Sequence, residues 1–223
     1  MFEAQKPPIQ ETKPQEETRV EILPGYANFV PAVFQASPFE YFDAQGTNIK
    51  PGETEYREGK VKEDPTAVRD FPIWQNEEGD ELRVVAKKIN TQKGQLKKGA
   101  HPFHEVEVME RVRTLGLPAP APIAKIQRGE QFLIVMERAK GMTTFDAALE
   151  DGFQEWSYDE DDKQTLKRSA EQAMADLQAR FEKAGIRRKW KLTDMVFEVD
   201  FSQRKVIGIT PVDWERTEIV ATE

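Results

Sequence analysis

The chain contains no cysteine among its 223 residues and only two histidines, His101 and His104. It therefore has no disulfides, thiolate metal sites or cysteine nucleophiles, and little material for a zinc site. Any metal ion would be a hard cation with oxygen ligands. No apolar run reaches the roughly 20 residues that span a bilayer, and the N-terminus lacks the pattern of a signal peptide. These absences predict a cytoplasmic protein without a membrane partner.

Basic residues are outnumbered, with 32 Lys and Arg against 40 Asp and Glu and a net charge of -8. General nucleic-acid binding depends on neutralising phosphates with lysine and arginine, so this balance argues against that class of partner. One local exception is the stretch RRKWK at residues 187–191. It could contact phosphate, and a solvated surface loop is an equally good interpretation.

The N-terminal half predicts mainly strands. Residues 1–18 are rich in Pro, Glu, Gln and Lys and predict a disordered tail. Residues 20–70 mix short apolar groups with Pro and Gly, which predicts loops and short strands without a definable register. The runs 67–75 and 82–90 flank a Gly-Asp turn, which predicts an antiparallel pair.

A helix is expected next, because the apolar residues of 101–116 recur at helical spacing and Gly116 provides a stop. The two histidines at its entrance are interpreted as capping or surface residues. Two strands, 123–126 and 132–136, should follow around a turn at Arg128 to Glu130.

Beyond Gly141 the composition shifts to helix formers. We expect a short helix at 145–149, an acidic loop at 150–162, and a long helix with an apolar stripe from Leu166 to Phe181. The chain should then form a hairpin that turns near Ser202.

Four stretches follow one another within residues 70–217: VVAKKI, HEVEVMERVRTLGLPAPAPIA, FLIVMERAKGMT and VDWE. In this order they resemble the strand-lysine motif, the glutamate-bearing helix with its following strand, the hinge, and the metal-binding aspartate of the protein-kinase-like superfamily. The resemblance is nearest to the aminoglycoside-phosphotransferase branch of small atypical kinases. It implies an α+β two-lobe fold, with a β-rich N-lobe at 19–140 and a reduced helical C-lobe at 141–223, and it implies ATP and Mg²⁺ as cofactors.

The resemblance also implies roles, because phosphoryl transfer depends mainly on positioning and charge neutralisation. A strand lysine would contact the nucleotide phosphates. This is Lys87 or Lys88, since strand alternation lets only one of them face the cleft. Glu105 would hold that lysine, with Glu107 as the alternative. A surface strand with two solvated lysines and an exposed helix glutamate are the competing interpretations.

The hinge and the last motif supply the other expected ligands. Backbone groups of Met136, Glu137 and Arg138 would bind adenine, and Asp213 would chelate the Mg²⁺ that bridges the phosphates. Asp194 occupies the position of a second metal ligand in the family, and a carboxylate suits Mg²⁺ there. Without the resemblance, a strand-end Asp such as Asp213 is more often a turn residue.

Three departures from the family pattern weaken the expectation of activity. Lys189 stands where the family has its catalytic base, although Asp194 would be that base if the alignment were shifted. No Gly-x-Gly-x-x-Gly loop precedes the lysine strand, and only ten residues follow Asp213. The sequence therefore predicts a kinase-like protein that binds ATP and Mg²⁺ with weak or lost transfer of phosphate. Besides the nucleotide, a protein partner and a small-molecule substrate are the candidate partners. The alternative is a non-enzymatic, pseudokinase-like module that binds a protein partner.

Overall fold

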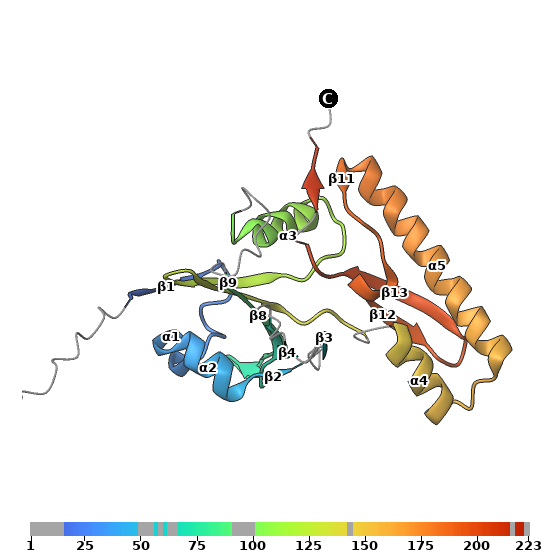
Figure 1. Cartoon of the computed structure of the whole chain (residues 1–223), viewed down its shortest axis with the longest axis horizontal. Coiled ribbons are helices and arrows are strands. Elements are labelled where there is room, and N and C mark those ends of the chain that lie inside the picture. The colour runs from blue at the N-terminus through green and yellow to red at the C-terminus, as the bar shows by residue number, and fades with distance from the viewer. Residues whose placement is uncertain are drawn as a thin grey trace, which may run out of the picture.

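A computed structural model describes residues 16–48, 56–57, 60–61, 67–90, 101–141, 145–214 and 217–220. Its largest feature is a six-stranded antiparallel sheet in the order β1-β9-β10-β8-β5-β2 (Figure 1). These strands are β1 (Thr18–Ile22), β2 (Thr47–Asn48), β5 (Ala67–Asp70), β8 (Val84–Asn90), β9 (Pro122–Arg128) and β10 (Gln131–Glu137). Two small hairpins accompany the sheet, β3 (Tyr56–Arg57) with β4 (Lys60–Val61) and β6 (Trp74–Gln75) with β7 (Glu81–Leu82). Antiparallel strands mixed with helices confirm the α+β class.

Helices cover both faces of this sheet (Figure 1). Helix α3 (His104–Thr114) packs on one face, and α1 (Ala32–Ala36) and α2 (Pro38–Gln45) pack on the other. Successive side chains of β8 point to opposite faces of the sheet. Val85 and Ile89 belong to the core under α3, whereas Val84 and Ala86 belong to the core under α1 and α2. Odd-numbered side chains of β8 therefore face α3.

The C-terminal part consists of helices around a second hairpin. Its elements are α4 (Phe145–Glu155), α5 (Glu160–Lys183), β11 (Ile186–Arg187), η2 (Leu192–Asp194), β12 (Met195–Asp200), β13 (Lys205–Pro211) and β14 (Glu218–Ile219). Strands β12 and β13 pair antiparallel on either side of Ser202, as predicted, and α5 packs along β13 (Figure 1). Strand β14 pairs with β11.

Several predicted elements are present in the structure. Strand β5 pairs with β8, and the turn at Gly129 joins β9 to β10. Helix α3 lies within the predicted range, and the long helix α5 follows the predicted apolar stripe.

Other predictions were wrong. The stretch 20–70 contains α1 and α2, and strand β1 already begins at Thr18, inside the predicted tail. The rest of that tail, residues 1–15, lies outside the described residues. The expected loop at 150–162 is mostly helical, because α4 continues to Glu155 and α5 begins at Glu160, where Asp159 and Asp162 form a capping box.

A shared hydrophobic core joins the sheet to the C-terminal part. Val106 and Met109 of α3 lie in one buried cluster with Leu177 and Phe181 of α5 and with Trp214. The domain boundary expected after residue 140 falls in the connection between β10 and α4. None of the described helices combines the length and apolarity that crossing a membrane requires.

Candidate functional site

Lys87 and Glu105 form a buried ion pair between β8 and α3. The Nζ atom of Lys87 lies 2.6 Å from Oε1 of Glu105, and their side chains are only 8% and 5% exposed. The odd position of Lys87 in β8 directs it towards α3, whose first turn carries Glu105. A buried charge requires a partner, so each residue holds the other in place. The structure thus contains the predicted contact between a strand lysine and Glu105.

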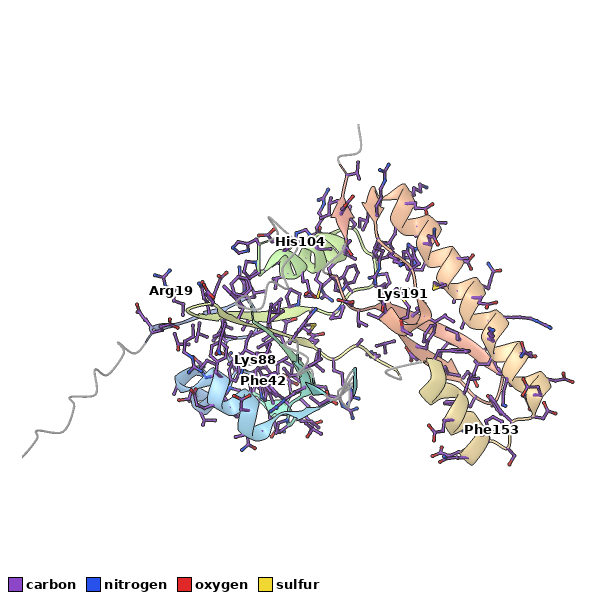
Figure 2. The ribbon with its side chains drawn as sticks, in the orientation of Figure 1. Arg19, Phe42, Lys88, His104, Phe153 and Lys191 are labelled. Carbon is purple, nitrogen blue, oxygen red and sulfur yellow. The ribbon has the colours of Figure 1, made fainter. Side chains whose placement is uncertain are left out.

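Lys88 lies on the opposite face of the sheet. Its Nζ atom is 3.2 Å from Oδ2 of Asp43 and 5.6 Å from the centre of the Phe42 ring. Figure 2 shows Lys88 beside Phe42, on the far side of the sheet from His104 of α3. Lys88 is therefore not part of the site, and the fallback residue Glu107 is exposed to solvent rather than paired with Lys87.

Asp213 extends this ion pair towards solvent. Its Oδ1 atom lies 3.5 Å from Nζ of Lys87, and its side chain is 47% exposed. The residue follows β13 and has a φ of 63°, in the left-handed region that residues other than glycine seldom adopt. Such backbone conformations cost free energy and concentrate at functional sites.

Asp194 ends η2 and directly precedes β12, so it lies at the same end of the hairpin as Asp213. Met195 is paired with Pro211, and the N–H of Val212 donates to the carbonyl of Asp194 at 2.8 Å. The half-buried carboxylate accepts a hydrogen bond from the Thr193 hydroxyl at 3.1 Å. The structure therefore brings both predicted metal ligands to one end of the hairpin.

These two carboxylates fit a magnesium ion only as a partial ligand set. In the described part of the chain, no group of three or more His, Asp or Glu side chains is placed to hold a metal. Mg²⁺ commonly takes one or two carboxylates and completes its shell with waters and substrate phosphates. The donors present suit that kind of site, and they do not form a closed, all-protein cage.

Some backbone groups of the expected hinge already form hydrogen bonds within the protein. The N–H of Glu137 donates to the Ala121 carbonyl and that of Arg138 to the Arg83 carbonyl, both at 2.8 Å. Met136 is paired within the sheet with Val85. Two of the backbone donors predicted to bind adenine, the N–H groups of Glu137 and Arg138, are therefore already bonded within the fold.

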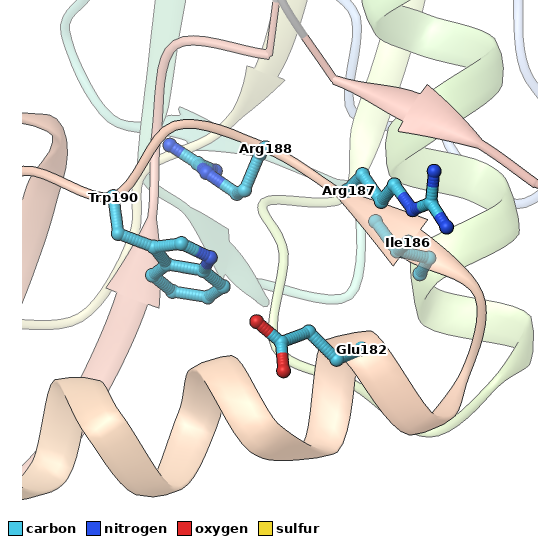
Figure 3. A pocket seen from close by; sticks show the side chains of 5 residues that line it. All are labelled: Glu182, Ile186, Arg187, Arg188 and Trp190. Atoms are coloured by element: carbon cyan, nitrogen blue, oxygen red, sulfur yellow. The ribbon is translucent and has the colours of Figure 1, made fainter.

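The basic loop at 187–191 borders a pocket of about 370 Å³, lined by Glu182, Ile186, Arg187, Arg188 and Trp190 (Figure 3). Lys189, which the resemblance to kinases places at the position of the base, is exposed. Burial lowers the pKa of Arg188, while the nearby carboxylates of Asp194 and Asp213 act in the opposite direction. Sequence reasoning missed Arg188, because nothing in RRKWK distinguishes it from Arg187.

The two histidines have structural contacts. Nδ1 of the exposed His101 accepts a hydrogen bond from the Phe103 N–H at the start of α3, and Nε2 of His104 lies 2.9 Å from the Thr217 carbonyl. The interpretation as a surface residue holds for His101, whereas the half-buried His104 links α3 to the C-terminal segment instead of capping the helix.

The sequence matches no known protein family, and a search of curated proteins finds no significant relative. Any assignment of function therefore depends on the geometry of the site.

Proposed function

We propose that this chain is a kinase-like protein, with the two-lobe fold of that superfamily, which binds ATP together with Mg²⁺ and has weak or lost phosphoryl transfer. The observation that carries the proposal is the row of charges formed by Glu105, Lys87 and Asp213, with contacts of 2.6 Å and 3.5 Å. It joins a sheet, a helix and the end of a distant hairpin at one point.

Each side chain in the row has a distinct task. Glu105 holds the ammonium group of Lys87 in a fixed position, and that group would contact nucleotide phosphates at the open side of the pair. Asp213 and Asp194 would hold Mg²⁺, which neutralises phosphate charge when it is bound. Because Asp213 is half-exposed, its carboxylate is accessible to a hydrated cation.

Weak catalysis is the expected consequence of Lys189. General-base assistance is commonly worth 10²- to 10⁴-fold in rate, and a protonated lysine accepts no proton. Its exposed side chain can still neutralise phosphate charge. We therefore expect this protein to bind ATP even where phosphoryl transfer is weak or lost.

Ligand-dependent thermal stabilisation tests the proposal. A ligand that binds only the folded state adds about 2.7 kcal/mol to stability at a concentration of 100 times its Kd. We expect ATP with Mg²⁺ to raise the melting temperature of the wild type, and this shift to be lost in Lys87→Met and in Asp213→Asn. Each variant is compared with its own ligand-free melting temperature, because Lys87 also contributes to folding.

Lys88→Met is the matched control, since it removes the neighbouring lysine from the opposite face of the same strand. Its response to ATP should equal that of the wild type. Equal shifts in Lys87→Met and Lys88→Met would exclude the site. A wild type that no nucleotide stabilises would leave the partner-binding module as the remaining interpretation.

A further inference from the structure

Arg188 contacts the residues on both sides of Asp213. Its Nη2 atom donates to the carbonyl of Val212 at 2.9 Å. Its guanidinium carbon lies 4.8 Å from the ring centre of Trp214 and 5.4 Å from that of Trp190. The side chain thus connects the loop after β11 to the segment that carries Asp213.

Further contacts hold the same two neighbours of Asp213. The N–H of Val212 is bonded to the Asp194 carbonyl, so Val212 is held through both of its backbone polar groups. Trp214 is 1% exposed and stacks on Phe181 of α5, with ring centres 6.1 Å apart. Asp213 stands between two fixed residues and has the left-handed φ of 63°. A strained conformation of this kind persists only where the surroundings determine it.

Arginine suits this position because its planar group can donate in its plane while it stacks on aromatic faces. Among the described residues, Nε and Nη1 of Arg188 are buried and have no hydrogen-bond partner, which is costly for stability alone. Arg187 makes a useful contrast. It is exposed, and Figure 3 shows its side chain pointing away from that of Arg188.

We propose that Arg188 is a positioning residue for Asp213. By holding Val212 and Trp214, it keeps Asp213 in the left-handed conformation that turns its carboxylate towards Lys87. The structural part of this inference stands by itself, and its consequence for Mg²⁺ rests on the proposed function.

Nuclear magnetic resonance of the full, ligand-free chain tests the structural part. The ¹³Cα shift and the amide-to-Hα coupling of Asp213 report its φ directly. We expect Arg188→Met to move both away from left-handed values and Arg187→Met to leave them unchanged. Arg188→Lys keeps the charge but loses the planar stacking, so it should give an intermediate result, and it serves as the test if Arg188→Met does not fold. Unchanged Asp213 signals in a folded Arg188 variant would overturn the proposal.

Metal binding tests the consequence, with Mn²⁺ as a spectroscopic substitute for Mg²⁺ in the presence of ATP. Arg188→Met should weaken Mn²⁺ binding about tenfold, which corresponds to about 1.4 kcal/mol, whereas Arg187→Met should not. If Asp213 moves in the Arg188 variant but the wild type binds neither Mn²⁺ nor ATP, the positioning role stands and the proposed function fails. If the wild type binds Mn²⁺ with ATP and a folded Arg188→Met binds them equally well, the consequence for metal is wrong.

Discussion

Gly141 is the residue at which the connection from β10 meets the hairpin β12–β13. Its φ of 108° suits glycine, and a Cβ atom at this position would overlap the carbonyl of Phe197 in β12. Gly79 also has a positive φ, 91°, but open space surrounds it. A substitution at Gly79 therefore measures the cost of the backbone conformation alone, whereas one at Gly141 adds the cost of a steric clash.

We expect Gly141→Ala to destabilise the protein more than Gly79→Ala does. The backbone strain should cost about 1 to 3 kcal/mol at either site, and overpacking against Phe197 should add about 1 to 3 kcal/mol for Gly141 alone. Urea unfolding of both variants measures the difference. Equal decreases in the free energy of unfolding would mean that Gly141 does not pack tightly against β12 in solution.

A hydrogen bond between Tyr26 and Glu137 fastens the loop after β1 to the end of β10, at a distance of 2.7 Å. Burial, and next the adjacent carboxylate of Glu137, raise the pKa of Tyr26 from 10.0 to about 12. Between these values the phenol stays protonated in the folded protein and ionises in the unfolded chain. The stability that it contributes is therefore complete below pH 10 and is lost as the pH rises towards 12.

Urea unfolding of the wild type and of Tyr26→Phe between pH 8 and pH 12 checks this pH dependence. The stability difference between the two proteins should be constant up to about pH 10 and should then decrease. The effect should be modest, because solvent screens a partly exposed phenol. A difference that stays constant up to pH 12 would show that the hydroxyl is not held by Glu137.

Elements with a strong pattern could be predicted from the sequence, and those that depend on tertiary contacts could not. Strand β8 and helix α5 carry clear apolar patterns. Helix α1 has only five residues, so it is too short to show a helical period. The acidic stretch 150–162 predicted a loop, but the ring of Tyr158 packs where a side chain at Gly152 would lie, and α4 continues to Glu155.

The same limit applies to the site. Strand alternation showed that only one of Lys87 and Lys88 could face a cleft, and the family resemblance suggested Glu105 as its partner. The packing of α3 then decides in favour of Lys87. Arg187 ends β11 and Arg188 follows it, and only a tertiary contact, that of Arg188 with Val212, distinguishes the two. The N–H groups of Glu137 and Arg138, at the expected hinge, are bonded to Ala121 and Arg83, which are distant in sequence.

The candidate site as a whole lies where the two parts of the molecule meet. Lys87 and Glu105 come from the sheet and its helix, while Asp194 and Asp213 come from the open end of the C-terminal hairpin, before β12 and after β13. Trp214, directly after Asp213, is buried in the core that both parts share. Because one core holds both halves of the site, the distance between Lys87 and Asp213 depends on the packing of the whole chain.

This arrangement predicts that the protein binds nucleotide but transfers phosphate slowly or not at all. For the kinase-like protein proposed above, we expect ATP turnover far below the roughly 1 to 100 s⁻¹ of typical kinases, because the resemblance places the exposed Lys189 at the position of the base. Lys189→Asp restores a carboxylate without touching Asp194 or Asp213, so it should raise turnover in an assay of ADP release. Lys189→Ala is the control for loss of the cation alone. Ordinary kinase rates in the wild type, abolished by Asp194→Ala and kept in Lys189→Ala, would instead make Asp194 the base and shift the alignment with the kinase family.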